Sequence, residues 1–365
     1  MTYTYIPGAA PAGQNGRATV RQSNIELLRI VAMMLVLIVH ADFLALGAPD
    51  ALALKALPVE SGLRVWLQGF ALVCVDVFVM ISGYFGIRPS VRGVLNFAFQ
   101  IIFWRIAVAI VAVAAGFASY GAVLRNLTPF AGDWFSPCYM LLMLVSPALN
   151  TFVEKLDRRA MGRYLLIFFG LQTVFGWIPG TVYDGGYSLI SMIGLYMLGR
   201  YVKLHVSEES RRQIGVSRGI FLYVLIVTVN SIAYCVGTIL FDGTGLSRSA
   251  HSLFMAYSSP LNIAASVALL VAFSNIELKS RIINSLAKSA YSVLLIHLNP
   301  LVFGFYLAAW QIIYSDYGAA AWFAALIPGC AAVYLACAVV DRIRIFFWDR
   351  IMFYWHKRDK AVKNL

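Results

Sequence analysis

Residues 24–42 read NIELLRIVAMMLVLIVHAD and place two titratable side chains, Arg29 and His40, inside one long apolar run. On insertion scales, a charged side chain at the centre of a membrane helix costs about 2.5 to 3.5 kcal/mol. We therefore interpret the run as a membrane-spanning helix, and Arg29 and His40 as parts of a functional site within it.

The composition indicates a polytopic membrane protein. Of the 365 residues, 61% are hydrophobic and only 13% are charged, and the mean hydropathy is +0.77. These values lie outside the usual composition of soluble domains. The sequence predicts an all-α membrane helix bundle with one transmembrane domain at residues 23–346, a flexible cytoplasmic extension at 1–22 and a basic cytoplasmic tail at 347–365.

About ten stretches are long enough to cross a hydrocarbon core, which needs about 20 apolar residues per helix. We expect residues 117–133, between the third and fourth of them, to form a loop or a short re-entrant segment. The predicted spans are 24–47, 63–86, 93–116, 134–153, 162–182, 186–204, 217–241, 252–274, 288–310 and 318–346.

The basic residues predict the orientation in the membrane. Most of the 29 Lys and Arg residues fall in alternate segments between the spans, whereas the other set of segments holds Lys55, Arg64, Arg125 and Arg248. Because positive residues stay in the cytoplasm, both termini are predicted to be cytoplasmic. A nucleic-acid surface would instead cluster its charge on a soluble domain, so no nucleic-acid partner is expected. The basic face would attract anionic ligands and membrane lipids.

Arg29 and His40 are predicted to share one face of their helix. Eleven residues make close to three turns, which separates the two side chains by about 16 Å along the axis. Glu26 joins this face and can pair with Arg29. Taken alone, Arg29 could lie near the membrane boundary with its guanidinium group reaching the membrane–water interface. Taken alone, His40 could be a buried histidine that packs against a neighbouring helix. Together, at two depths, they favour an extended anionic substrate that enters from the cytoplasm.

A set of motifs in this order resembles the acyltransferase-3 family of integral membrane O-acyltransferases. The resemblance begins with Arg29, ten residues and then His40, and it covers residues from about 21 to 300. Val79 departs from the family pattern, which has a second phenylalanine there. The other motifs are DVFVMISGY from Asp76, WFSPCY from Trp134 followed by Ser146, Pro147 and Asn150, YSSP from Tyr257, and AYSVLLIH ending at His297.

The resemblance implies a bundle of about ten helices in the bacterial inner membrane. It implies transfer of an acyl group from cytoplasmic acyl-CoA, usually acetyl-CoA, to a hydroxyl of a saccharide or glycolipid acceptor such as exopolysaccharide or lipopolysaccharide O-antigen. The chemistry requires a base for the hydroxyl proton and donors for the developing oxyanion. His40 is the candidate base, and Arg29 is the candidate contact for the CoA phosphates.

Further candidates follow from span and depth. Glu26 and Asp76 are assigned to the catalytic group with His40, and Asp76 is expected either to orient a histidine or an arginine or to make a structural hydrogen bond. Helix packing is an alternative at Gly83, and a hydrogen-bonded packing role is an alternative at His297. We assign cofactor binding to Ser82, Gly83 and Arg105, and substrate binding to Trp134, Tyr139 and His297.

The mechanism, the distinction from a transporter, the acceptor and the oligomeric state stay open from the sequence. His40 can act as a general base in a direct transfer, or it can carry the acyl group as an acyl-histidine. A transporter or flippase would also hold intramembrane charges, although the two halves show no repeat of the kind common in transporters. No residues have metal-ligand spacing, so no metal is expected. Neither the acceptor nor the oligomeric state follows from these residues.

Overall fold

The structure is a computed structural model that describes residues 21–128, 132–176, 178, 181–244 and 253–363, and every regular element in these ranges is helical. The predicted extension at 1–22 lies almost wholly outside them. The helices are α1 Ser23–Val39, α2 Ala51–Ala56, α3 Pro58–Ala71, α4 Cys74–Phe85, α5 Val91–Ala114, α6 Tyr120–Leu127, α7 Phe135–Lys155, α8 Arg158–Phe175, α9 Leu189–His205, α10 Glu208–Leu240, α12 Pro260–Ser274, α13 Arg281–Leu286, α14 Ala290–His297 and α15 Phe303–Lys363.

Six helical segments in the described ranges are long and apolar enough to span a membrane. The class of multi-pass membrane protein is therefore supported, while the count of about ten spans stays a prediction. Helix α12 is apolar but shorter. The six segments are Ser23–Leu44, Pro58–Phe85, Val91–Ala114, Phe135–Lys155, Glu208–Leu240 and Phe303–Trp355.

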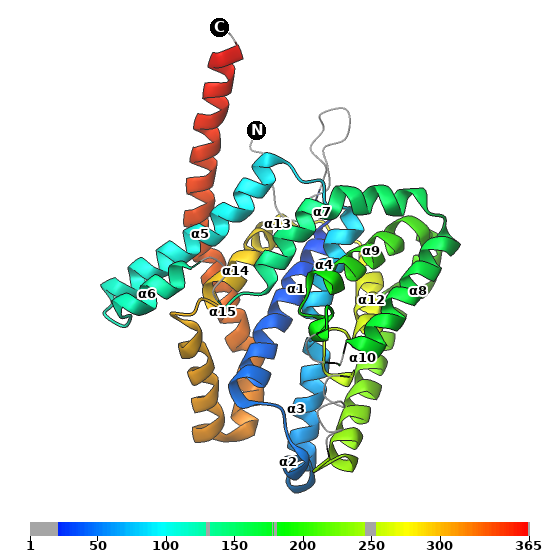
Figure 1. Ribbon diagram of the computed structural model, residues 1–365. Helices are drawn as coiled ribbons and strands as arrows, with labels where there is room; N and C mark the ends of the chain where they lie inside the picture. The colour runs from blue at the N-terminus through cyan, green and yellow to red at the C-terminus, as the bar shows by residue number, and fades with distance from the viewer. Residues whose placement is uncertain (1–20, 129–131, 177, 179–180, 245–252, 364–365) are drawn as a thin grey trace.

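Helix α1 lies at the centre of the bundle and packs against α3, α4, α12, α14 and α15 (Figure 1). Of the residues in the most apolar 18-residue stretch of each span, 61% are buried in the span that begins with α1 and 78% in the span formed by α3 and α4. The corresponding share in α15 is only 28%. The two central segments therefore face protein, whereas α15 presents most of its apolar surface outward, as expected of a helix that faces lipid.

Two glycines bring α4 and α9 into close contact. A side chain at Gly83 would overlap the carbonyl of Tyr196, and one at Gly199 would overlap the carbonyl of Met80. Small residues at such crossings let two helix backbones approach each other in a membrane bundle. The backbone of α9 therefore occupies the side of α4 that Gly83 presents.

Several predicted spans differ from the observed helices. Residues 288–310 do not form one helix, because α14 ends at His297 and α15 begins at Phe303. Helix α15 then runs through the predicted boundary near 318 with a kink at Gly318, where φ is +81°, and continues through the predicted tail to Lys363. Residues 117–133 include helix α6. These breaks lie where glycine or a short turn interrupts an apolar stretch that hydropathy reads as continuous.

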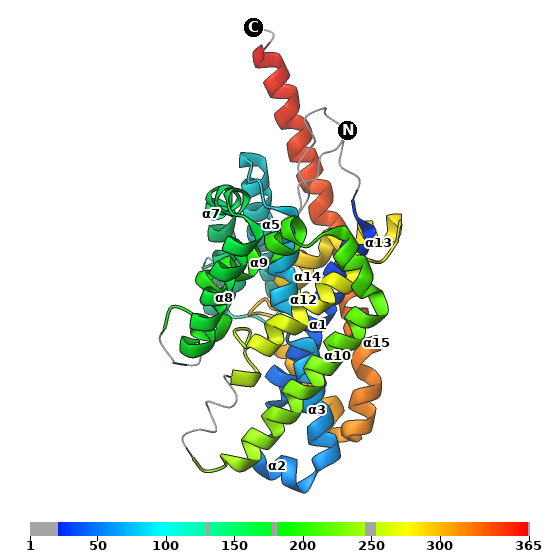
Figure 2. The same ribbon diagram turned by 90° about the vertical axis from the view of Figure 1, so that its right-hand side faces the viewer.

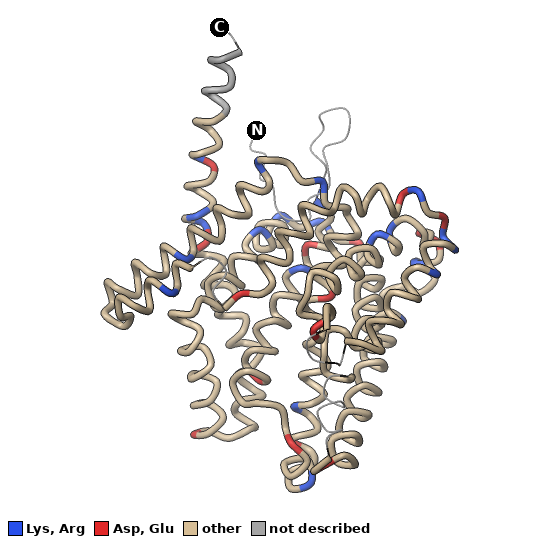
Figure 3. The backbone as a smooth tube through the Cα atoms, in the orientation of Figure 1, with Lys and Arg blue, Asp and Glu red and all other residues tan. Residues whose placement is uncertain are grey.

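The start of α1 and the end of α15 lie at the same end of the bundle (Figures 1 and 2). Figure 3 shows Lys and Arg gathered toward this end. We call it the basic end, and it includes the start of α10 and the end of α4. The arrangement agrees with the predicted placement of both termini on one side, and we propose that the basic end faces the cytoplasm.

Candidate active site

A cavity lies beside α1 and contains both residues of the opening motif. Arg29 and His40 line it together, as the helical spacing predicts. Lys288 joins Arg29 near the basic end, and His40 lies about three turns farther along α1. The remaining lining residues are Met33, Val36, Val39, Cys74, Val75, Phe78, Ser82, Phe97, Gln100, Asp133, Trp134, Phe135, Tyr139, Tyr257, Ala287, Tyr291, Leu294 and Leu298.

His40 is held by a second histidine. Its Nδ1 lies 2.9 Å from Nε2 of His297, and Nδ1 of His297 lies 2.6 Å from the carbonyl oxygen of Val293. A carbonyl only accepts, so Nδ1 of His297 carries the proton and its Nε2 accepts from Nδ1–H of His40. This order leaves Nε2 of a neutral His40 with its lone pair available. His297 is 4% exposed and lies outside the lining set.

The helix changes its geometry at the histidine. Residues His40–Leu44 form a π-helical segment at the end of α1, and such segments are frequent at functional sites. Side chains of α15 donate to carbonyls on both sides of it: the Tyr306 hydroxyl to Leu37 at 2.8 Å and the Gln311 amide to Ala45 at 2.7 Å. The start of α15 therefore stabilises the backbone that carries His40.

A buried ion pair anchors the same segment. Arg64 on α3 donates through Nε to Asp42 at 2.8 Å and through a terminal nitrogen to the carbonyl of Gly47 at 2.6 Å. Asp42 is only 1% exposed, so its charge needs this partner. The predicted outward-facing arginine at 64 is thus a structural partner of the residue two positions after His40.

The basic side chains at the other end of the cavity form a second group. Arg29 donates to Glu26 at 2.6 Å, and Arg21 lies 3.5 Å from the other carboxylate oxygen. The pairing of Glu26 with Arg29 is therefore confirmed, but Glu26 does not line the cavity. Burial lowers the pKa of Lys288, and Arg21 and Arg342 lower it further. An anion near Lys288 would counter this excess of positive charge.

Aromatic rings and hydroxyls line the space between these two groups. The Tyr139 hydroxyl lies 2.8 Å from that of Ser82, and its ring stacks on Phe135 with centroids 5.5 Å apart. Trp134 contacts Tyr257 with ring centroids 6.1 Å apart. The cavity is therefore apolar with a few hydroxyl groups, the usual character of a small-molecule site.

Besides Glu26 and His297, three predicted site residues lie outside the cavity lining. Asp76 accepts a hydrogen bond from the Asn262 amide at 2.8 Å, which fits the alternative of a structural hydrogen bond. Gly83 faces the backbone of α9, which fits the alternative of helix packing. Arg105 donates to the carbonyl of Asn126 at 2.8 Å and lines a small neighbouring pocket.

Sequence reasoning missed Lys288 and Gln100 as site residues, and both line the cavity together with Asp133. Lys288 is the first residue of the predicted span 288–310, and from the sequence it counted only toward the distribution of basic residues that sets the orientation. Asp133 accepts hydrogen bonds from the backbone and the hydroxyl of Ser136, and that hydroxyl lies 2.5 Å from the Tyr291 hydroxyl. These contacts connect the loop before α7 with α7 and α14, and no local sequence motif predicts them.

Comparison with protein-family models gives one match, to an acyltransferase domain of the acyltransferase-3 family, over residues 22–342. The chain belongs to the acyltransferase-3 family. Searches of curated proteins and of solved structures find no match. Membership of the acyltransferase-3 family and the six apolar helices together indicate a membrane acyltransferase. Within the described residues, no three His, Cys, Asp or Glu side chains are grouped as metal ligands.

Proposed function

We propose that this acyltransferase transfers an acyl group, most simply acetyl, from acyl-CoA to a hydroxyl of an envelope saccharide in the bacterial inner membrane, with His40 as the general base. The observation that carries the proposal is the hydrogen-bond order from His40 through His297 to Val293. It leaves Nε2 of His40 as an acceptor on a cavity-lining residue, which a general base requires.

The direct mechanism uses this nitrogen twice. Nε2 of His40 takes the proton of the acceptor hydroxyl while the hydroxyl oxygen attacks the thioester carbonyl. The tetrahedral intermediate then collapses, its C–S bond breaks, and the thiolate of CoA takes the proton back from His40. During the step His40 carries a positive charge, and its Nδ1–H bond to His297 stabilises that charge. His297 is thus a positioning residue and not a substrate contact.

The donor is proposed to enter from the basic end. Arg29 and Lys288 line the cavity there, and guanidinium and ammonium groups bind phosphate oxygens. The span of about 16 Å from Arg29 to His40 suits an extended donor whose thioester lies far from its phosphates. The apolar walls between them match an acyl chain and a slender linker.

The acceptor is proposed to contact the aromatic side of the cavity. Trp134, Tyr139 and Tyr257 line it, and aromatic faces with nearby hydroxyls are suited to the faces and the hydroxyls of a sugar ring. This part of the proposal rests on the arrangement of the rings and on the family. The acceptor sugar can therefore be linked to a lipid or belong to a free oligosaccharide.

The experiment is acyl transfer in membranes from radiolabelled acetyl-CoA to extracted envelope glycans. His40→Ala should lower the rate by about 10²–10⁴-fold, the usual contribution of general acid–base catalysis. His205→Ala, which changes a histidine of α9 outside the cavity, serves as the control and should retain full rate. Equal rates in the two variants would contradict the assignment of His40 as the general base, and no transfer above membranes without the protein would favour a transporter.

The direct and covalent mechanisms differ in a test without acceptor. Purified protein is incubated with labelled acetyl-CoA, quenched and digested, and the peptide that contains His40 is examined. We expect no label there, because Nδ1 is bonded to His297 and Nε2 acts on the acceptor proton. Acetyl label on His40 would replace the direct mechanism with an acyl-histidine intermediate.

A further inference from the structure

A second pocket lies at the basic end and shares no lining residue with the cavity. On α4 it contains Tyr84, which is two residues beyond Ser82 of the cavity and so points to the opposite side of the helix. The pocket therefore lies behind α4, between the ends of α1, α9, α10 and α12. Its lining residues are Gln22, Asn24, Tyr84, Lys203, Glu208, Arg211, Arg212, Ser274 and Asn275.

Positive charge dominates this lining. Lys203, Arg211 and Arg212 face a single carboxylate, that of Glu208. Glu208 is 3.8 Å from Arg211 and its side chain is 73% exposed, so the pair is weak and screened by water. Among the described residues, Lys203 has no carboxylate within ion-pair distance. The pocket therefore has an excess of cations that its own walls do not neutralise.

Two of these cations lie beside the same aromatic ring, that of Tyr84. Arg211, whose side chain is 6% exposed, lies with its guanidinium 5.7 Å from the centre of the Tyr84 ring, and the Lys203 ammonium lies 4.9 Å from the same centre. The ring attracts each cation by only about 0.5–2 kcal/mol, while the cations repel each other. An anion between them would remove the repulsion.

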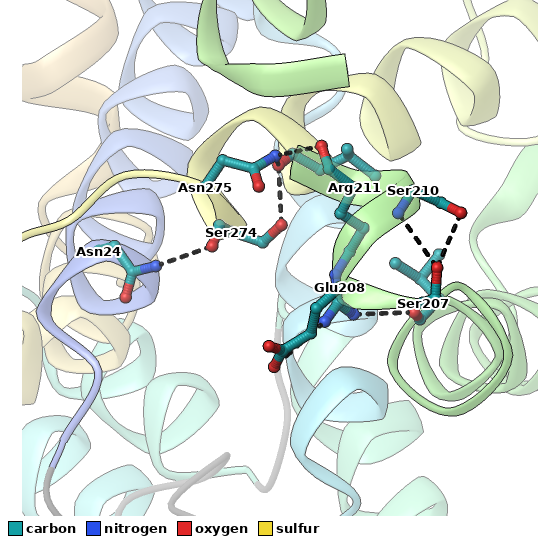
Figure 4. Close-up of polar contacts among 9 residues, drawn as sticks. Asn24, Ser207, Glu208, Ser210, Arg211, Ser274 and Asn275 are labelled. Atoms are coloured by element: carbon teal, nitrogen blue, oxygen red, sulfur yellow. Dashed lines mark hydrogen bonds and ion pairs between the residues drawn. The ribbon is translucent and has the colours of Figure 1, made fainter. Parts of the chain in front are cut away.

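The walls around the cations are fixed by amide groups. Figure 4 shows Asn24 and Asn275 on one side of Arg211 and Ser207 and Ser210 on the other. The Asn275 amide donates to the carbonyl of Arg211 at 2.8 Å, and that of Asn24 to the carbonyl of Phe273 at 3.0 Å. These bonds tie α1, α10 and α12 together, so the pocket exists before any ligand enters and little ordering cost is paid on binding.

We propose that this pocket binds a phosphate group. The lining offers guanidinium groups on Arg211 and Arg212, the ammonium of Lys203 and the hydroxyl of Tyr84. Phosphate suits this set of donors, because its oxygens accept several hydrogen bonds at once. It can come from the headgroup of an anionic phospholipid or from a soluble phosphorylated ligand in the cytoplasm. The proposal does not depend on the chemistry at His40.

The test compares two double variants of the full-length protein. Lys203→Gln with Arg212→Gln removes two pocket cations and leaves buried Arg211 in place. Arg158→Gln with Arg159→Gln removes two exposed charges at the start of α8 and serves as the matched control. Binding is measured by calorimetry with pyrophosphate in neutral detergent and by native mass spectrometry of retained phosphatidylglycerol, both without acyl donor.

We expect wild-type protein and the control to bind one of the two probes at least about tenfold more tightly than the pocket variant, the effect of one lost charge-assisted hydrogen bond. Selective loss of pyrophosphate binding identifies a soluble ligand, and selective loss of phosphatidylglycerol identifies a lipid. Equal affinity of the two variants for both probes, or no binding by the wild type, would overturn the proposal. Thermal unfolding of both variants at the wild-type temperature verifies that the fold is intact.

Discussion

The two ends of α1 hold their charged groups in different ways. Near the basic end, Glu26 and Arg29 are three residues apart and pair at 2.6 Å within one helix. At the other end, His40 and Asp42 are held by His297 and Arg64, which come from α14 and α3. A site that rests on neighbours in the sequence tolerates changes elsewhere in the bundle, whereas one assembled from distant helices depends on how those helices pack.

Of the changes that test this difference between the two ends of α1, Arg64→Met is expected to have the largest effect. It leaves the Asp42 carboxylate buried without its partner. Removing one member of a buried pair costs about 3–5 kcal/mol, and the π-helical segment that carries His40 should lose its position. We expect a lower unfolding temperature in detergent and a loss of acetyl transfer.

Lys55→Met is the control for Arg64→Met. Lys55 pairs with Asp242 at 3.2 Å, but both side chains are about half exposed, so this pair contributes at most about 1 kcal/mol. The double change Asp42→Asn with Arg64→Met should regain most of the stability, because no unpaired charge is left. Equal melting of the two single variants would show that the Asp42–Arg64 pair does not hold the segment.

The second effect concerns the partner of the base. His297→Ala removes the acceptor for Nδ1–H of His40 and should lower kcat by about 10–100-fold, the equivalent of about 1.5–3 kcal/mol for a hydrogen bond to a charged group. His297→Gln keeps an acceptor oxygen and should recover part of kcat.

A merely structural role for His297 predicts a different result. In that case kcat of the two variants would fall only as far as their unfolding temperatures fall, and the pH at which kcat is half-maximal would stay that of the wild type. Loss of the hydrogen bond to imidazolium should instead shift that pH downward in His297→Ala, because the protonated form of His40 is less stable. The kcat–pH profiles of both variants check this.

The sequence predicted the basic end better than the histidine end. The Glu26–Arg29 pair and the shared face of Arg29 and His40 follow from helical spacing alone, and both are observed. The partner of His40 lies 257 residues away and depends on α14 ending where it does. Nor does any local pattern mark the π-helical segment, since the donors that stabilise it lie on α15. For Asp76 the sequence left two roles open, orienting a charged side chain or making a structural hydrogen bond, and its amide partner Asn262 lies 186 residues away.

The third effect is a change in donor affinity at the basic end. Arg29→Lys keeps the charge and loses the planar fork, so KM for acetyl-CoA should rise about tenfold while kcat changes little, the signature of lost uniform binding. Arg21→Lys changes a neighbouring arginine that pairs with Glu26 but does not line the cavity, and its KM should stay near that of the wild type. A fall in kcat with unchanged KM in Arg29→Lys would place Arg29 at the reacting groups instead.

The smallest effect separates the stability of the bundle from the placement of His40. Tyr306→Phe removes the donor to the carbonyl of Leu37, which costs about 1 kcal/mol, and kcat should fall severalfold because the turn before His40 loses a support. Tyr314→Phe, about two turns farther along α15, removes a hydroxyl that donates to Glu60. It should change stability by a similar amount and leave kcat unchanged, because its partner belongs to α3 and not to the π-helical segment. Measuring kcat and unfolding temperature for both variants decides whether the Tyr306 contact supports catalysis, and a matching fall in kcat for Tyr314→Phe would attribute the effect to general loosening of the helix.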